Sequence, residues 1–87
     1  MLIRSQDKTI LMNCDFFAVE ENGNKYEVIT LSGKSGISIV LGMYSTKEKA
    51  LKVLNDIQYF YDCTYCETFQ MPQDNEVGAW QKKKLNK

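Results

Sequence analysis

The residues best suited to chemistry are two cysteines in a C-x-x-C spacing, Cys63 and Cys66. A redox pair of this type places its first cysteine at a helix N-terminus, where the helix dipole lowers the thiol pKa. Here the pair follows a helical pattern and so falls at its C-terminal end. A structural zinc site needs four ligands, and the chain offers no histidine and only Cys14 as a further cysteine. Zinc shared by four cysteines of two chains remains an alternative, but we expect a helix-to-strand junction without metal, cofactor or disulfide.

A second motif, Gly33-Lys34-Ser35, resembles the end of a phosphate-binding loop. The full pattern requires a glycine five residues before the Gly33-Lys34 pair, and Val28 occupies that position. A phosphate-binding loop also joins a strand to a helix, whereas this segment lies between two β-like runs. The motif is therefore interpreted as a hairpin loop.

General acid–base chemistry has few residues to use. Without histidine, the chain lacks the side chain that titrates near neutral pH. Ser5, Asp7 and Lys8 have the residue types of a catalytic triad, but no pattern in the sequence brings them together. Other carboxylates flank a predicted turn and are expected to be solvated: Glu20, Glu21 and Glu27. We expect a protein that is not an enzyme.

The strongest structural signal is a helix that starts near residue 46 and ends near residue 62. Ser45 and Glu48 have the spacing of a capping box, in which Ser45 is the N-cap. Apolar residues then recur at helical spacing, at Ala50, Val53, Leu54, Ile57 and either Phe60 or Tyr61. This pattern predicts an amphipathic helix with one buried face.

The rest of the chain has β character. Strands are expected at residues 2–4, at 9–12 continuing through 16–20, at 25–31, at 37–41 and at 65–71. Asn22-Gly23 is expected at the centre of a tight turn, so that residues 16–20 and 25–31 run antiparallel. The order β-β-β-β-α-β predicts a two-layer α+β fold, with a mainly antiparallel sheet and one helix packed on one face. Residues 1–72 are predicted to form a single domain, and residues 73–87 a C-terminal tail.

Composition and charge restrict the classes of function that the chain can have. The chain has 87 residues, 44% of them hydrophobic and 25% charged, which is ordinary for one globular domain. It has 11 basic and 11 acidic residues, and four of the lysines lie in the tail at positions 82, 83, 84 and 87. The remainder then carries a net charge of −4, which disfavours nucleic acid. A nucleic-acid-binding accessory protein that uses sheet aromatics and the basic tail is the alternative function.

No apolar run approaches the ~18 residues that a membrane span requires. Residues 1–8 also lack a basic region followed by a long apolar stretch, so no signal peptide is expected. We expect a cytoplasmic protein.

The opening Met1–Lys8, and Leu41–Ala50 with the helix after it, resemble a family of small uncharacterised proteins. Gram-positive bacteria and their phages or mobile elements encode this family. The likeness covers roughly residues 1–62 and does not reach the tail. The family has no assigned activity, so the resemblance implies a cytoplasmic accessory protein of a mobile element and assigns no functional residue.

Apolar residues on both faces of the predicted sheet suggest a partner. One helix covers one face, so the second face needs another cover. Apolar residues also occur in the otherwise polar tail, and tryptophan buries a large area when it finds a partner. We therefore expect a non-catalytic interaction or regulatory module that binds itself, as a homodimer, or another protein. The predicted interface residues are Trp80, Val77, Tyr26, Val28 and Val40.

Overall fold

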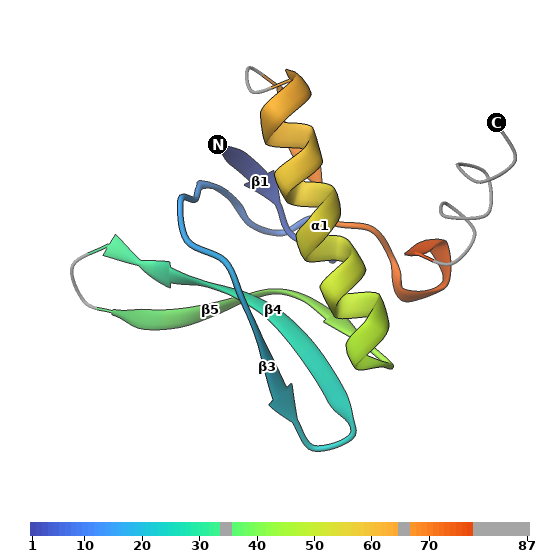
Figure 1. Ribbon diagram of the computed structural model, residues 1–87. Helices are drawn as coiled ribbons and strands as arrows, with labels where there is room; N and C mark the ends of the chain where they lie inside the picture. Colours follow the sequence, from blue (N-terminus) through green and yellow to red (C-terminus); the bar gives the residue numbers. More distant parts are fainter. Residues whose placement is uncertain (34–35, 65–66, 78–87) are drawn as a thin grey trace, which may run out of the picture.

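The computed structural model describes residues 1–33, 36–64 and 67–77. It shows an α+β fold with mainly antiparallel strands and one main helix packed against them, as the sequence predicts (Figure 1). The elements are β1 (Leu2–Arg4), β2 (Leu11–Asn13), β3 (Ala18–Asn22), β4 (Lys25–Ser32), β5 (Ile37–Tyr44), α1 (Lys47–Thr64) and β6 (Phe69–Gln70). The last described residues, 74–77, are helical.

The described strands form two three-stranded sheets. In the first, β1 lies between β2, which is antiparallel to it, and β6, which is parallel to it. In the second, β4 lies between β3 and β5, and both pairings are antiparallel. The run expected to continue from residues 9–12 into 16–20 is thus two strands in different sheets. The chain leaves the first sheet at Cys14, whose side chain is buried and whose N–H donates to the Met1 carbonyl at 2.8 Å.

The hairpin between β3 and β4 has the antiparallel pairing that the sequence predicts. Ala18 is the register partner of Ile29, and Asn22 that of Lys25. The turn itself is shifted by one residue from the prediction, because Gly23 and Asn24 occupy its centre and Asn22 still belongs to β3. Gly23 has a φ of 64°, a conformation that glycine adopts without steric cost. Glycine at the first central position is typical of a tight hairpin turn.

A β-bulge interrupts the pairing of β4 with β5. Val28 pairs with Gly42 and Ile29 pairs with Val40, so Leu41 is the extra residue. Because the bulge adds one residue, Val40 and Met43 point to the same face of the sheet. The alternation of a regular strand would place them on opposite faces.

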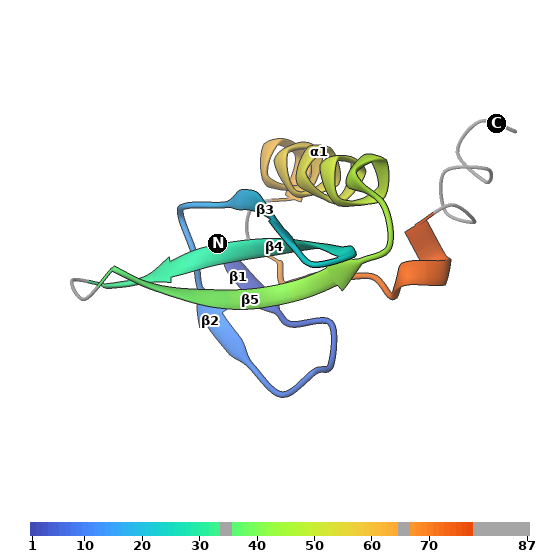
Figure 2. The same cartoon turned by 90° about the horizontal axis from the view of Figure 1, so that it is seen from below.

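Helix α1 packs on the face of the second sheet that carries Val28 and Tyr44. Figure 2 shows α1 above β3 and β4, with β2 below β5 on the opposite side of that sheet. Ala50, Val53 and Ile57 are buried in the shared core, which confirms the amphipathic pattern. Of the other predicted apolar positions, Leu54 and Phe60 are half-buried and Tyr61 is exposed. Within the described ranges, no helix combines the length and apolar composition needed to cross a membrane.

The helix begins one residue later than the capping box predicts. The Thr46 hydroxyl accepts a hydrogen bond from the Lys49 N–H at 3.1 Å, which makes Thr46 the N-cap. Ser45 instead bonds to Asp74, which lies 29 positions further along the chain. The sequence motif could not reveal this choice, because the competing partner is distant in sequence.

Candidate functional site

The outer face of the β4–β5 hairpin, opposite the helix, is the candidate interaction surface. Leu31, Val40 and Met43 share this face by register and leave 39%, 41% and 41% of their surfaces exposed. We call these three residues the outer strip. Ile37, at the far end of the hairpin, is 63% exposed. Each of these side chains leaves in water apolar surface that binding would bury.

Strand β5 is also an edge strand of its sheet. It runs for eight residues, Ile37–Tyr44, without a charged residue or a proline. Exposed edges usually carry lysine, proline or other features that prevent pairing with another chain. The absence of such residues from a strand this long favours strand pairing at this edge.

Gln6 covers the second half of the β5 edge. Its backbone N–H donates to the Leu41 carbonyl at 2.7 Å, and its side-chain Nε2 donates to the Met43 carbonyl at 3.1 Å. The Met43 N–H donates in turn to Gln6 Oε1 at 2.9 Å. A side chain therefore satisfies this part of the edge as a neighbouring strand would, whereas the Gln6 contacts do not extend to residues 37–40.

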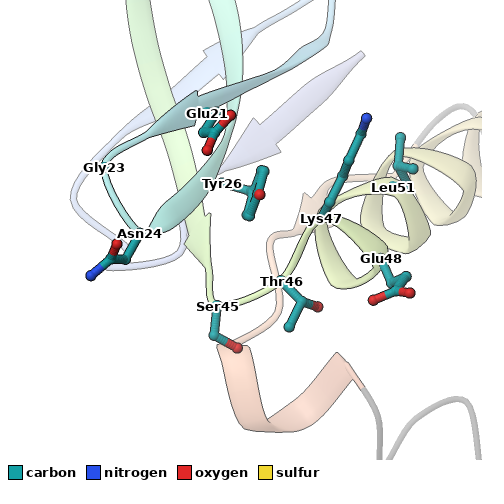
Figure 3. A pocket seen from close by; sticks show the side chains of 9 residues that line it. All are labelled: Glu21, Gly23, Asn24, Tyr26, Ser45, Thr46, Lys47, Glu48 and Leu51. Carbon is teal, nitrogen blue, oxygen red and sulfur yellow. The ribbon is translucent and has the colours of Figure 1, made fainter.

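A groove of about 560 Å³ lies between the β3–β4 turn and the start of α1. Figure 3 shows Tyr26 between the hairpin and the helix, with Glu48 pointing away from it. The Ser45 hydroxyl donates to Asp74, and the Thr46 hydroxyl caps the helix. The hydroxyls of Ser45 and Thr46 are thus engaged in structural bonds. The lining residues are Glu21, Gly23, Asn24, Tyr26, Ser45, Thr46, Lys47, Glu48 and Leu51.

A second pocket, of about 460 Å³, lies beside the C-terminal half of α1 and includes Cys14. Burial raises the pKa of the Cys14 thiol, so the neutral and unreactive form is favoured. Cys63 is exposed at the end of α1, and Cys66, the second cysteine of the C-x-x-C spacing, lies outside the described residues. In the part of the chain that the structure describes, no three His, Cys, Asp or Glu residues are grouped to hold a metal ion.

Ser5 and Asp7 come together in the loop between β1 and β2, where they build a turn. The Ser5 hydroxyl donates to Asp7 Oδ1 at 2.8 Å and accepts from the Ile10 N–H at 3.0 Å. The hydroxyl and N–H of Thr9 also donate to Asp7 Oδ1, and these bonds, led by that of the hydroxyl, lower the pKa of Asp7 to about 2. A carboxylate this acidic is a poor general base at neutral pH.

The predicted interface residues are not on one surface. Val28 and Val77 are buried in the core, and Tyr26 is half-buried in the groove. Val40 is exposed on the outer strip, on the opposite face of the sheet from Val28. Trp80 lies outside the described residues. Sequence reasoning left Leu31 and Met43 out of the interface. Met43 shares a face with Val40 only through the bulge, which leaves no mark on the apolar pattern.

The aromatic side chains differ in exposure between strands and helix. On the described strands, Tyr44 is fully buried, and Tyr26 and Phe69 are half-buried. Tyr59 and Tyr61 of α1 are exposed. The use of sheet aromatics to bind nucleic acid stays a prediction.

Comparison of the chain with known protein families, curated proteins and solved structures found no match. The resemblance to small proteins of Gram-positive bacteria and their mobile elements therefore stays a prediction.

Proposed function

We propose that this protein is a non-catalytic interaction module that self-associates through the outer strip and the edge of β5. One observation carries the proposal: β5 is an uncharged edge strand whose residues 37–40 lie beyond the Gln6 contacts, and three exposed apolar side chains share one face of the hairpin beside it. Pairing at the edge satisfies backbone groups, and burial of the strip removes apolar surface from water.

A second copy of the chain is the partner that fits this surface. A strand that pairs antiparallel with its own copy about a two-fold axis is self-complementary, so one surface serves both subunits. Because β5 carries no charge, two such strands approach without electrostatic repulsion. The formal net charge of the whole chain is zero, so long-range repulsion between copies is also absent. In this arrangement the two outer strips form one continuous apolar face.

The test compares the solution mass of three proteins by light scattering after size exclusion. Val40→Lys places a charge on the outer strip, and Leu51→Lys places the same charge on α1. The side chains of Val40 and Leu51 are equally exposed, at 41%, so the two substitutions are matched in burial. We expect a dimer for the unmodified chain and for Leu51→Lys, and a monomer for Val40→Lys. An unmodified chain that stays monomeric as its concentration rises would refute the proposal.

We propose further that Trp80 contributes to self-association and that the protein acts as a cytoplasmic accessory protein. Truncation after Val77 tests the tail, because it retains the described residues that pack against the domain. The expected result is a weaker dimer, with the melting temperature unchanged at concentrations low enough for both chains to be monomeric. A truncated chain that associates as strongly as the full chain would remove Trp80 from the interface.

A further inference from the structure

The β3–β4 turn contains a feature that the proposed interface does not use. Asn22 is the only asparagine in the sequence that precedes a glycine. Gly23 sits in the turn at a φ of 64°, and a Cβ placed on it would meet no atom within 4 Å. Gly23 has no side chain, and the space around its Cα is open, so access to its backbone nitrogen is not sterically hindered. Asn22 itself is exposed.

The Asn22 side chain has one defined partner. Its Nδ2 donates to Glu27 Oε2 at 2.9 Å, across the β3–β4 pair. Glu27 is only 7% exposed, so its carboxylate depends on donors from the protein. The side-chain amide of Asn22 thus donates to a buried carboxylate, and the residue after Asn22 is an unhindered glycine.

We propose that Asn22-Gly23 is a site of spontaneous deamidation, and that the loss of the Asn22–Glu27 hydrogen bond couples this modification to the stability of the hairpin. The Gly23 nitrogen attacks Asn22 Cγ, a new C–N bond closes a five-membered succinimide, and Nδ2 leaves as ammonia with the proton of the Gly23 N–H. Water then opens either carbonyl of the ring and gives an aspartyl or isoaspartyl residue at position 22. The net reaction consumes one water and releases one ammonia, without an oxidant or reductant.

The product places a carboxylate where the amide donor stood. Two carboxylates then face each other at the contact that joins β3 to β4, and the buried Glu27 oxygen loses a donor. The isoaspartyl product also inserts a methylene into the backbone, which shifts the register at the end of β3. Since β3 packs against α1, the modification weakens both the hairpin and the cover of the core.

The experiment follows the full chain during incubation at mildly alkaline pH by peptide mass mapping. The expected result is that conversion of amide to acid accumulates at position 22 well ahead of every other asparagine. Asn22→Gln retains a side-chain amide but forms the cyclic intermediate much more slowly, so it should block the modification at this position. Conversion at comparable rates in all asparagine-containing peptides would overturn the proposed site.

The stability effect is measured separately on two matched substitutions. Asn22→Asp mimics the aspartyl product, and Asn24→Asp adds the same charge to the same turn at a residue outside the Glu27 contact. We expect Asn22→Asp to lower the melting temperature by about 4 to 8 °C and Asn24→Asp to change it little. Equal melting temperatures for the two variants would show that the Glu27 contact does not couple modification to stability.

Discussion

The carboxylate of Asp74 accepts hydrogen bonds from both the backbone N–H and the hydroxyl of Ser45, at 2.8 and 3.1 Å. Lys49 Nζ lies 3.3 Å from the same carboxylate. These bonds fix the helical turn at residues 74–77 to the start of α1, and they place Val77 in the core. The tail that the sequence predicts from residue 73 onward thus packs against the domain through its first described residues.

Replacement of Asp74 by alanine should destabilise the protein. The Ser45 N–H loses its acceptor and Lys49 loses its ion pair, and because the site is partly exposed we expect a cost of about 1 to 2 kcal/mol. Urea denaturation measures the change in the free energy of unfolding. Asn75→Ala, an exposed neighbour in the same turn, is the control and should be nearly neutral. Equal losses in both variants would mean that the turn contributes through its backbone alone.

Asp74 should also make stability depend on pH in the acid range. The Ser45 N–H, and to a smaller extent Lys49, lower the pKa of Asp74 below its ordinary value of 3.8. A carboxyl group with a lowered pKa in the folded state stabilises the fold above its unfolded pKa, and this contribution disappears as the pH falls through the folded value. The stability difference between the unmodified chain and Asp74→Asn should therefore be largest near neutral pH and shrink below about pH 4. A difference that stays constant from neutral to acid pH would contradict this assignment.

Thr46 should matter more than Ser45 for the start of α1. Thr46→Ala removes the acceptor of the Lys49 N–H and should cost about 1 kcal/mol, which lowers the melting temperature by roughly 4 to 8 °C in a domain of this size. Lys47→Ala, at an exposed first-turn position, serves as the control. Ser45→Ala keeps the backbone bond to Asp74 and should have a smaller effect than Thr46→Ala. The reverse order in thermal melts would restore Ser45 as the N-cap.

Gly42 should not tolerate alanine. A Cβ at this position would lie 2.7 Å from the hydroxyl and 3.0 Å from the ring of Tyr44, which is fully buried. The same hydroxyl donates to the Pro72 carbonyl at 2.8 Å, so displacement of the ring breaks that bond. We expect Gly42→Ala to cost about 1 to 3 kcal/mol in urea denaturation.

A double variant checks the cause. In Gly42→Ala/Tyr44→Phe the closest clashing atom is absent, so the combined loss should be smaller than the sum of the single losses. If the loss in the double variant equalled the sum of the two single losses, the strain caused by Gly42→Ala would not arise from the Tyr44 hydroxyl.

The parts of the fold that were predictable depend on local patterns. Val53 and Ile57 follow the helical period, and Gly23 marks the turn that joins β3 to β4. The parts that were not predictable depend on contacts between distant residues. Thr46 replaces Ser45 as the N-cap because Asp74 binds Ser45 from 29 positions away.

The candidate surface shows the same division. Val40 is exposed and so can take part in an interface. Val28 is buried in the core on the helix side of the sheet. Met43 shares the face of Val40 only because Leu41 bulges out of register and turns into the core, whereas Leu31 lies on that face by the regular alternation of β4. A period-two pattern cannot show one extra residue, so the outer strip could be recognised only in three dimensions.

The parallel pairing of β1 with β6 sets an order of events during synthesis. Ile3 and Phe69 are register partners, so the β2-β1-β6 sheet cannot be completed until residue 70 has left the ribosome. The β3–β4 and β4–β5 hairpins close over short loops and are available much earlier. Until β6 arrives, the nascent chain exposes the edge of β1 beside the apolar side chain of Ile3. We expect this interval to be the period in which the chain is most open to aggregation and to capture by chaperones.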